Sequence, residues 1–269
     1  MITFSIDLED PSETYAPDGR YTLMTRRILD ICDDYQRRAT FFTVGRVAEA
    51  APRLVQEIAA RGHEIAYHSH AHVPLTHEDP VRFAREGRED KDRLEQLSST
   101  PVIGFRAPAF SLTKKTLWAL DTLAELGFRY SSSIMPTRIS RYGFSDAPRT
   151  PFRWPNDIIE LPLPVADAGP LRVPYLGGIY LYAQNFALVR RWVARANPQE
   201  VLWTYAHPYD FDREEKFLPQ LHGSLFASTV LWLARRTAEK KIRKVLSLGN
   251  GTTFAETIKP LMTAPYIRL

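Results

Sequence analysis

The chain has one cysteine, no long hydrophobic run and little excess charge, and each shortage excludes a class of protein. With Cys32 alone, no disulfide can form within the chain, and its place on an apolar helical stripe with Leu29 and Tyr35 favours a buried hydrophobe over a catalytic thiol. The longest apolar run near the C-terminus, 225–233, is too short to span a bilayer. Because Met1 already belongs to a strand-like segment, we expect no signal peptide and a cytoplasmic protein.

The net charge of +4 on 269 residues is small, and its acids and bases are too evenly mixed to predict a nucleic-acid surface. One basic run is a local exception; it comprises Arg235, Arg236, Lys240, Lys241, Arg243 and Lys244. Such a run is typical of a solvated helix face, and the alternative is a peripheral contact with anionic lipid or a lipid-linked glycan. These features leave the oligomeric state open.

Apolar runs alternate along the chain with helix-patterned segments. The runs lie at 2–7, 38–44, 64–67, 101–105, 128–131, 158–163 and 201–206. Repeated strand–helix units predict a parallel sheet that is closed, or nearly closed, into a barrel. A chain of this length commonly forms one such domain. We therefore expect a single α/β catalytic domain over 1–269, with a basic helical C-terminal extension from about 213 to 269.

Four of the seven histidines fall between residues 63 and 72, around the strand-like run 64–67. His68 and His72 are four residues apart, a spacing that places two side chains on one face of a helical turn, where both can bind one ion. The pair alone fits a solvated polar turn as well as a metal site. Other residues must therefore decide.

An acidic cluster follows the first strand. Asp7, Glu9 and Asp10 lie within four residues, and carboxylates this close repel one another unless a cation or a proton is shared. Asp7 and Glu9 fall on the same side of an extended chain, so one can bind a metal while the other acts as a base. An exposed acidic turn that caps the next element is the alternative.

Two further strands end in residues that carry chemistry. Arg106 follows the run 101–105, and His207 follows the run 201–206. In barrel enzymes the C-terminal ends of the strands form one rim, on which the active site lies. Residues two hundred positions apart are therefore expected to meet in one pocket.

In this order the motifs resemble the polysaccharide deacetylase family, the NodB-homology carbohydrate esterases, from Ile2 to about Asp212. The segments Asp7-Leu8-Glu9-Asp10, Phe105-Arg106-Ala107-Pro108 and His207-Pro208-Tyr209 are most similar to a branch associated with bacterial surface-glycan and exopolysaccharide gene clusters. The resemblance implies a distorted barrel with about seven parallel strands. It also implies hydrolytic removal of an acetyl group from an N-acetylated sugar, whether in a glycan, a lipid-linked intermediate or a sugar nucleotide.

The resemblance further implies one divalent ion, bound by His68, His72 and a carboxylate. Two imidazoles and one carboxylate favour Zn²⁺, with Co²⁺ or another divalent ion as the alternative. Either Glu9 or Asp10 supplies the carboxylate, and strand alternation favours Glu9. By resemblance, Asp7 is the base, held by an ion pair with Arg106, and His207 protonates the departing amine.

Five residues are expected to contact the substrate: Ala109, Phe110, Trp154, Tyr180 and Tyr209. By resemblance, backbone N–H groups near Ala109 meet the oxyanion. Trp154 belongs to the proline-rich segment 135–157, interpreted as a substrate loop with an irregular surface loop as the alternative.

Two positions depart from the family pattern. The family often has Asp-Asp at the first motif, whereas here the second carboxylate is displaced to Glu9 or Asp10. Ser131 stands where the family usually carries an aspartate that holds the histidine acid. Either another group tunes His207 or the enzyme is slow. Without a carboxylate partner, the pKa of His207 should be lower than in relatives that keep the aspartate. Two alternative functions follow, namely another amide or formamide hydrolase and a non-catalytic glycan-binding protein.

Overall fold

Eight strands form one curled sheet in the computed structural model, which describes residues 1–12, 14–138, 142–214, 217 and 225–261. Their order across the sheet is β10-β1-β2-β3-β4-β5-β7-β6. The bounds are β1 Ile2–Leu8, β2 Thr40–Thr43, β3 Glu64–Tyr67, β4 Gly104–Phe105, β5 Tyr130–Ser131, β6 Phe152–Arg153, β7 Ile159–Glu160 and β10 Leu202–Ala206.

Seven of these strands run parallel, which confirms the predicted α/β fold and the predicted strand number. The eighth, β6, pairs antiparallel with β7 at one edge. Among the described strands no pairing joins β6 to β10, so the sheet is a half-barrel and not a closed one. Most strands are shorter than their apolar runs, and residues at the run ends such as Ile158 and Leu163 are buried outside the strands.

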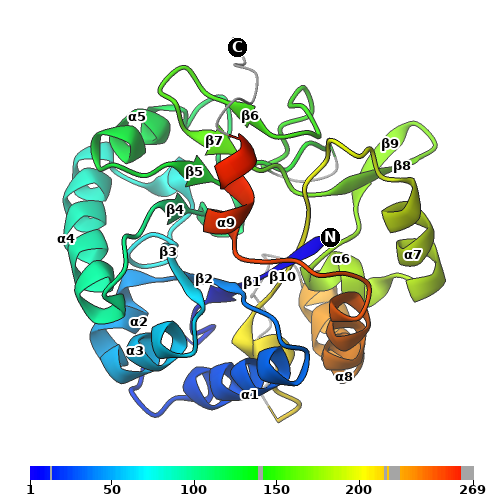
Figure 1. Ribbon diagram of the computed structural model, residues 1–269, viewed down its shortest axis with the longest axis horizontal. Helices are drawn as coiled ribbons and strands as arrows, with labels where there is room; N and C mark the ends of the chain where they lie inside the picture. Colours follow the sequence, from blue (N-terminus) through cyan, green and yellow to red (C-terminus); the bar gives the residue numbers. More distant parts are fainter. Residues whose placement is uncertain (13, 139–141, 215–216, 218–224, 262–269) are drawn as a thin grey trace.

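Helices surround the sheet in the order expected of strand–helix units (Figure 1). They are α1 Arg20–Asp34, α2 Gly45–Ala50, α3 Pro52–Ala60, α4 Pro80–Ser98, α5 Trp118–Glu125, α6 Gly178–Ala183 and α7 Phe186–Arg195. Cys32 lies fully buried on the inner face of α1, and burial raises the pKa of its thiol to about 12. A thiol with so high a pKa is not a nucleophile at neutral pH, so the predicted structural role agrees with the structure.

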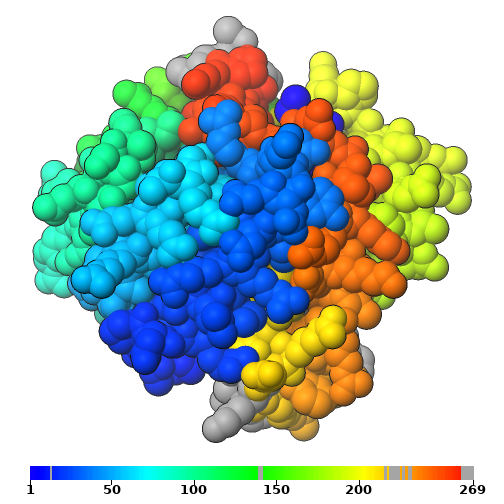
Figure 2. All heavy atoms as spheres, turned by 60° about the horizontal axis from the view of Figure 1, so that its bottom comes forward, coloured from blue at the N-terminus to red at the C-terminus, as the bar shows by residue number. Residues whose placement is uncertain are grey.

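The C-terminal segment returns to the sheet. Helix α8, Leu225–Leu246, lies against α1 on the face shown in Figure 2. Arg27 of α1 and Glu239 of α8 form an ion pair of 2.7 Å. Helix α9, Phe254–Ile258, lies in the middle of the half-barrel (Figure 1). The N–H of Phe254 donates to the Thr40 hydroxyl at the start of β2. The predicted extension from about 213 to 269 therefore contributes to the core, although residues 215–216, 218–224 and 262–269 lie outside the described residues.

A hairpin of β8, Val165–Ala168, and β9, Leu171–Pro174, stands apart from the main sheet. In the part of the chain that the structure describes, no helix combines the length and the apolar character needed to cross a membrane.

Candidate active site

Glu9, His68 and His72 meet beyond the C-terminal ends of β1 and β3. One ligand atom of each lies within 4.8 Å of the others, as expected of three residues that share one ion. His68 directly follows β3, and its Nδ1 lies 2.7 Å from the carbonyl oxygen of Arg106. Because a carbonyl only accepts, Nδ1 carries the proton and Nε2 keeps its lone pair for a ligand, the usual arrangement of a metal-binding histidine.

The two histidines come together without the helical turn that their spacing predicted. Residues 68–74 form an irregular loop, in which Ser69 and His72 adopt left-handed conformations with φ of 61° and 55°. The rings of His68 and His72 are 5.0 Å apart. Non-glycine residues with positive φ are uncommon and collect at functional sites. The conformation of this loop, and not a helical turn, therefore brings the two histidines together.

The electrostatics of this group suit an ion. Burial raises the pKa of Glu9, but the opposite charge of His72 outweighs burial and lowers it, so the carboxylate is ionised. Burial lowers the pKa of His68 to about 4, which keeps its imidazole neutral at neutral pH. A metal requires both of these protonation states in its ligands. Burial lowers the pKa of His72, but the charge of Glu9 outweighs burial and raises it, so a bound ion would take the place of the His72 proton.

Asp10 points elsewhere. Its carboxylate accepts hydrogen bonds from the backbone N–H groups of Ser12 and Tyr15, each at 2.9 Å, and from the hydroxyls of Ser12 and Thr14. Asp10 therefore shapes the turn after β1, while Glu9 lies beside the histidines. The acidic cluster therefore contains both a candidate metal ligand, Glu9, and a carboxylate that stabilises a turn, Asp10.

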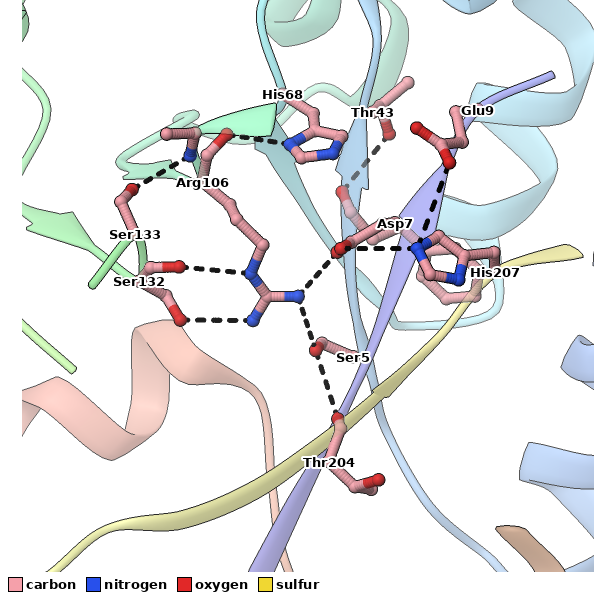
Figure 3. A network of polar contacts seen from close by, with 12 residues as sticks. Ser5, Asp7, Glu9, Thr43, His68, Arg106, Ser132, Ser133, Thr204 and His207 are labelled. Carbon is pink, nitrogen blue, oxygen red and sulfur yellow. Dashed lines mark hydrogen bonds and ion pairs between the residues drawn. The ribbon is translucent and has the colours of Figure 1, made fainter. Parts of the chain in front are cut away.

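Asp7 and Arg106 form a buried ion pair at the centre of the site (Figure 3). The guanidinium nitrogen Nη1 lies 2.5 Å from Asp7 Oδ1 and 2.9 Å from the hydroxyl of Ser5. Nε and Nη2 donate to the carbonyl and hydroxyl of Ser132. Aromatic rings surround the cation, whose Cζ lies 3.9 Å from the ring centroid of Phe42 and 4.5 Å from that of Trp203. These contacts hold Arg106, which in turn orients the carboxylate of Asp7.

His207 faces the same carboxylates from β10. Its Nε2 lies 3.9 Å from Asp7 Oδ2 and 3.9 Å from Glu9 Oε1, as Figure 3 shows. Its Nδ1 lies 3.0 Å from Asp210 Oδ2, which also accepts from the backbone N–H of His207 and from the Tyr182 hydroxyl at 2.8 Å each. Asp210 lies in the short 3₁₀ helix η3, Pro208–Asp210.

Asp210 is another group that tunes the pKa of His207, as the sequence analysis allowed when it found serine at position 131. Burial does lower that pKa, but the charge and hydrogen bond of Asp210 outweigh burial and raise the pKa to about 9. Ser131 instead donates to the Ser133 hydroxyl behind Arg106. Sequence reasoning missed Asp210, although a Pro directly after the histidine and an acid three residues on is the pattern of a capped helical turn.

The predicted substrate residues lie at different depths. Tyr209 stacks on His207 with ring centroids 4.6 Å apart, and Ala109 and Phe110 adopt left-handed conformations just after Arg106. Tyr180 is half-buried, with its hydroxyl 3.8 Å from the sulfur of Met135. Trp154 is only 2% exposed and packs against Phe152 in the core. It lies in the hydrophobic core and not on the surface of the segment 135–157, of which residues 139–141 lie outside the described part.

Two family models match the chain. Residues 15–131 match polysaccharide deacetylase, and residues 132–259 match a domain of unknown function (DUF3473). A chitooligosaccharide deacetylase of Sinorhizobium fredii is 32% identical over 110 residues, 39% of this chain and 47% of that protein. A peptidoglycan-N-acetylglucosamine deacetylase of Bacillus cereus is 29% identical over 91 residues, 34% of this chain and 42% of that protein. The chain thus spans about half the length of the curated relatives it matches.

Solved structures share the fold at low identity. A protein from Mycobacterium smegmatis described as a polysaccharide deacetylase aligns with a TM-score of 0.66 and 18% identity, over 100% of this chain and 92% of that chain. An allantoinase aligns with a TM-score of 0.54 and 13% identity, over 89% and 85%. Such likeness shows the fold alone, because one fold hosts many chemistries. The family model identifies residues 15–131 as a polysaccharide deacetylase domain of the NodB-homology type, and the solved structures agree with it in fold.

Proposed function

We propose that this protein is a metal-dependent hydrolase that removes the acetyl group from an N-acetylated sugar of a glycan. The observation that supports it most is the meeting of two sets of groups at one place. Glu9, His68 and His72 form a metal-ligand set, and His207 Nε2 lies 3.9 Å from both Asp7 and Glu9. A ligand set beside a carboxylate and an imidazole is what hydrolysis of an unreactive amide requires.

The three candidate ligands fit a divalent ion. Glu9 Oε2 is buried and lies against His72 Nε2, so the carboxylate and the imidazole direct their ligand atoms at one point. Two histidine nitrogens and one carboxylate form a common catalytic zinc set, so Zn²⁺ is the first choice and Co²⁺ the second. When bound there, a divalent ion supplies Lewis-acid polarisation of the acetyl carbonyl and acidifies water.

Asp7 and His207 divide the proton transfers. Asp7, held by Arg106, accepts a proton from the water that attacks the acetyl carbon. His207, kept protonated by Asp210, donates to the sugar nitrogen as the C–N bond breaks, so acetate and the amino sugar leave. The Tyr182 hydroxyl keeps Asp210 directed at the ring, which fixes Nε2 as the atom that faces the substrate.

The substrate is a glycan of surface-polysaccharide synthesis. The curated relatives are named for deacetylation of chitooligosaccharides and of peptidoglycan N-acetylglucosamine, which supports an N-acetylated hexosamine as the reacting unit. Part of the proposal is that the glycan is attached to a lipid, because α8 exposes Leu225, Trp232 and Leu233 at 64%, 37% and 48%. The exposed Arg236 lies over Trp232, and this pairing of a tryptophan with a cation suits an anionic lipid surface.

Acetate release from N-acetylated oligosaccharides, nucleotide sugars and simple acetamides and formamides, with and without a chelator, tests the proposal. We expect chelator-sensitive release from the oligosaccharides. Turnover of the non-sugar amides alone would favour another C–N hydrolase. Binding of glycans without any turnover would favour a glycan-binding protein.

A further inference from the structure

The loop between the two histidines of the candidate metal site is held in a costly conformation. Ser69 and His72 both have positive φ, and neither is a glycine. Such conformations persist only where surrounding contacts impose them. The loop therefore needs an anchor outside itself.

His68 and His72 differ in how they are held. His68 is fixed by the bond from its Nδ1 to the Arg106 carbonyl. The side chain of His72 contacts Glu9 and lies against the His68 ring, and within the described residues no hydrogen bond to its Nδ1 is found. The position of His72 thus depends on the backbone of the loop.

Two neighbouring helices, α2 and α4, form hydrogen bonds with the loop, the first to its backbone and the second to the His70 side chain. At the start of α2, the N–H groups of Gly45 and Arg46 donate to the carbonyls of Ser69 and His70, at 2.9 and 3.0 Å. From α4, the carboxylate of Asp90 lies 3.1 Å from His70 Nδ1. These contacts flank the loop from two sides.

Asp90 is built into its place. It is fully buried, and Arg93 donates to its Oδ1 at 2.8 Å. A Cβ atom at Gly45 would come within 2.1 Å of Asp90 Oδ2, so this carboxylate occupies space that only a glycine leaves open. The buried carboxylate, the glycine and the loop are therefore packed as one unit.

A second metal site is the other reading of this cluster, since Glu49, His70 and Asp90 also bring ligand atoms within 4.8 Å of one another. Arg93 argues against it, because its guanidinium contacts Asp90 at 2.8 Å and Glu49 at 3.1 Å. The guanidinium of Arg93 already forms ion pairs with both carboxylates. The cluster therefore anchors the loop and does not bind an ion.

We propose that Asp90 is a positioning residue, which acts through His70 to hold His72 in place for the metal and so sets the affinity of the site. This inference rests on the proposed function, because it requires that Glu9, His68 and His72 bind an ion. The anchor lies outside the ligand set, on a helix that contributes no ligand. Loss of such supporting partners typically weakens metal affinity by about 10–100-fold.

Calorimetric titration of Zn²⁺ into chelator-treated protein tests the inference, with thermal unfolding of each metal-free variant measured in parallel. We expect Asp90→Asn and His70→Leu to bind Zn²⁺ about 10–100-fold more weakly than wild type. His70→Asn should bind within about threefold of wild type, because its amide nitrogen can replace Nδ1 as the donor to Asp90. Asp92→Asn, an exposed position on the same helix, is the matched control and should bind as wild type does.

A purely structural role would lower the unfolding temperatures and leave the affinity of the folded variants unchanged. Wild-type affinity in both Asp90→Asn and His70→Leu would overturn the inference and leave the proposed function standing. Failure of the wild-type protein to bind Zn²⁺ or Co²⁺ would overturn both. If Asp90→Asn does not fold, the comparison of His70→Leu with His70→Asn decides, and equal affinity in these two would overturn the inference.

Discussion

Asp210 gives the sharpest prediction, because its carboxylate lies 3.0 Å from His207 Nδ1 and, with smaller contributions from Glu9 and Asp7, outweighs burial and raises the pKa of the imidazole to about 9. A proton donor works only while protonated, so the rate of the wild-type enzyme should fall as pH rises through about 9. An opposite charge at this distance shifts a pKa by about 1–3 units. Asp210→Asn should therefore move the alkaline limb of the pH–rate profile down by about 1–3 units.

The expected loss depends on pH. With a pKa of about 9, His207 is roughly 90% protonated at pH 8, whereas a pKa near 7 leaves about 10%, so Asp210→Asn should be about tenfold slower at pH 8. At pH 6 both enzymes should be close in rate. The same linkage affects folding: the stability contributed by the raised pKa is present below the unfolded value of 6.5 and is lost as pH rises through about 9.

The assay is kcat/KM for acetate release between pH 5.5 and 10, with metal content checked at each pH. Glu214→Gln, an exposed carboxylate four residues further along the chain, is the matched control and should keep the wild-type profile. An alkaline limb within about 0.3 units of wild type in Asp210→Asn would refute the assignment of that limb to a His207–Asp210 pair.

Three further predictions concern the other groups. Asp7→Asn should keep the ion yet lower turnover about 10²–10⁴-fold, as for loss of a positioned base, and loss of the ion would make Asp7 a ligand. Glu9→Ala should empty the site, whereas Asp10→Ala should keep full metal content by elemental analysis; the reverse pattern would exchange the two assignments. Trp232→Ser should reduce cosedimentation with anionic phosphatidylglycerol vesicles and not with neutral ones, and unchanged binding would remove α8 from any lipid contact.

The fold and the convergence of the site were predictable because both depend on periodicity. Apolar runs at regular spacing fixed the parallel order, and parallel order alone brings Asp7, His68, Arg106 and His207 to one edge of the sheet. The same reasoning favoured Glu9 over Asp10 as the metal ligand but could not exclude Asp10, because the chain leaves the strand at that point. Their directions depend on the turn that Asp10 forms with Ser12 and Tyr15.

Residue type alone indicated the wrong role for side chains whose function depends on their surroundings. His63 belongs to the dense histidine cluster, yet its Nδ1 accepts the N–H of Ala39 and its ring packs on Phe41, so it supports the sheet. Trp154 suggested a stacking platform, but its indole N–H lies 3.3 Å from the buried carboxylate of Glu160. The carboxylate partner of His207 is Asp210, three residues along the chain, and not a residue at position 131. Burial and partner identity, which a single sequence does not reveal, decide the roles of His63 and Trp154, whereas the local sequence pattern does indicate Asp210.

The most direct test of the account is acetate release from an N-acetylated oligosaccharide by chelator-treated protein as Zn²⁺ is added back in steps. The account predicts no turnover without the ion, a rise that saturates at one ion per chain, and no recovery in the His68→Ala, His72→Ala double variant. Full turnover in the chelated protein, or recovery in the double variant equal to wild type, would contradict it.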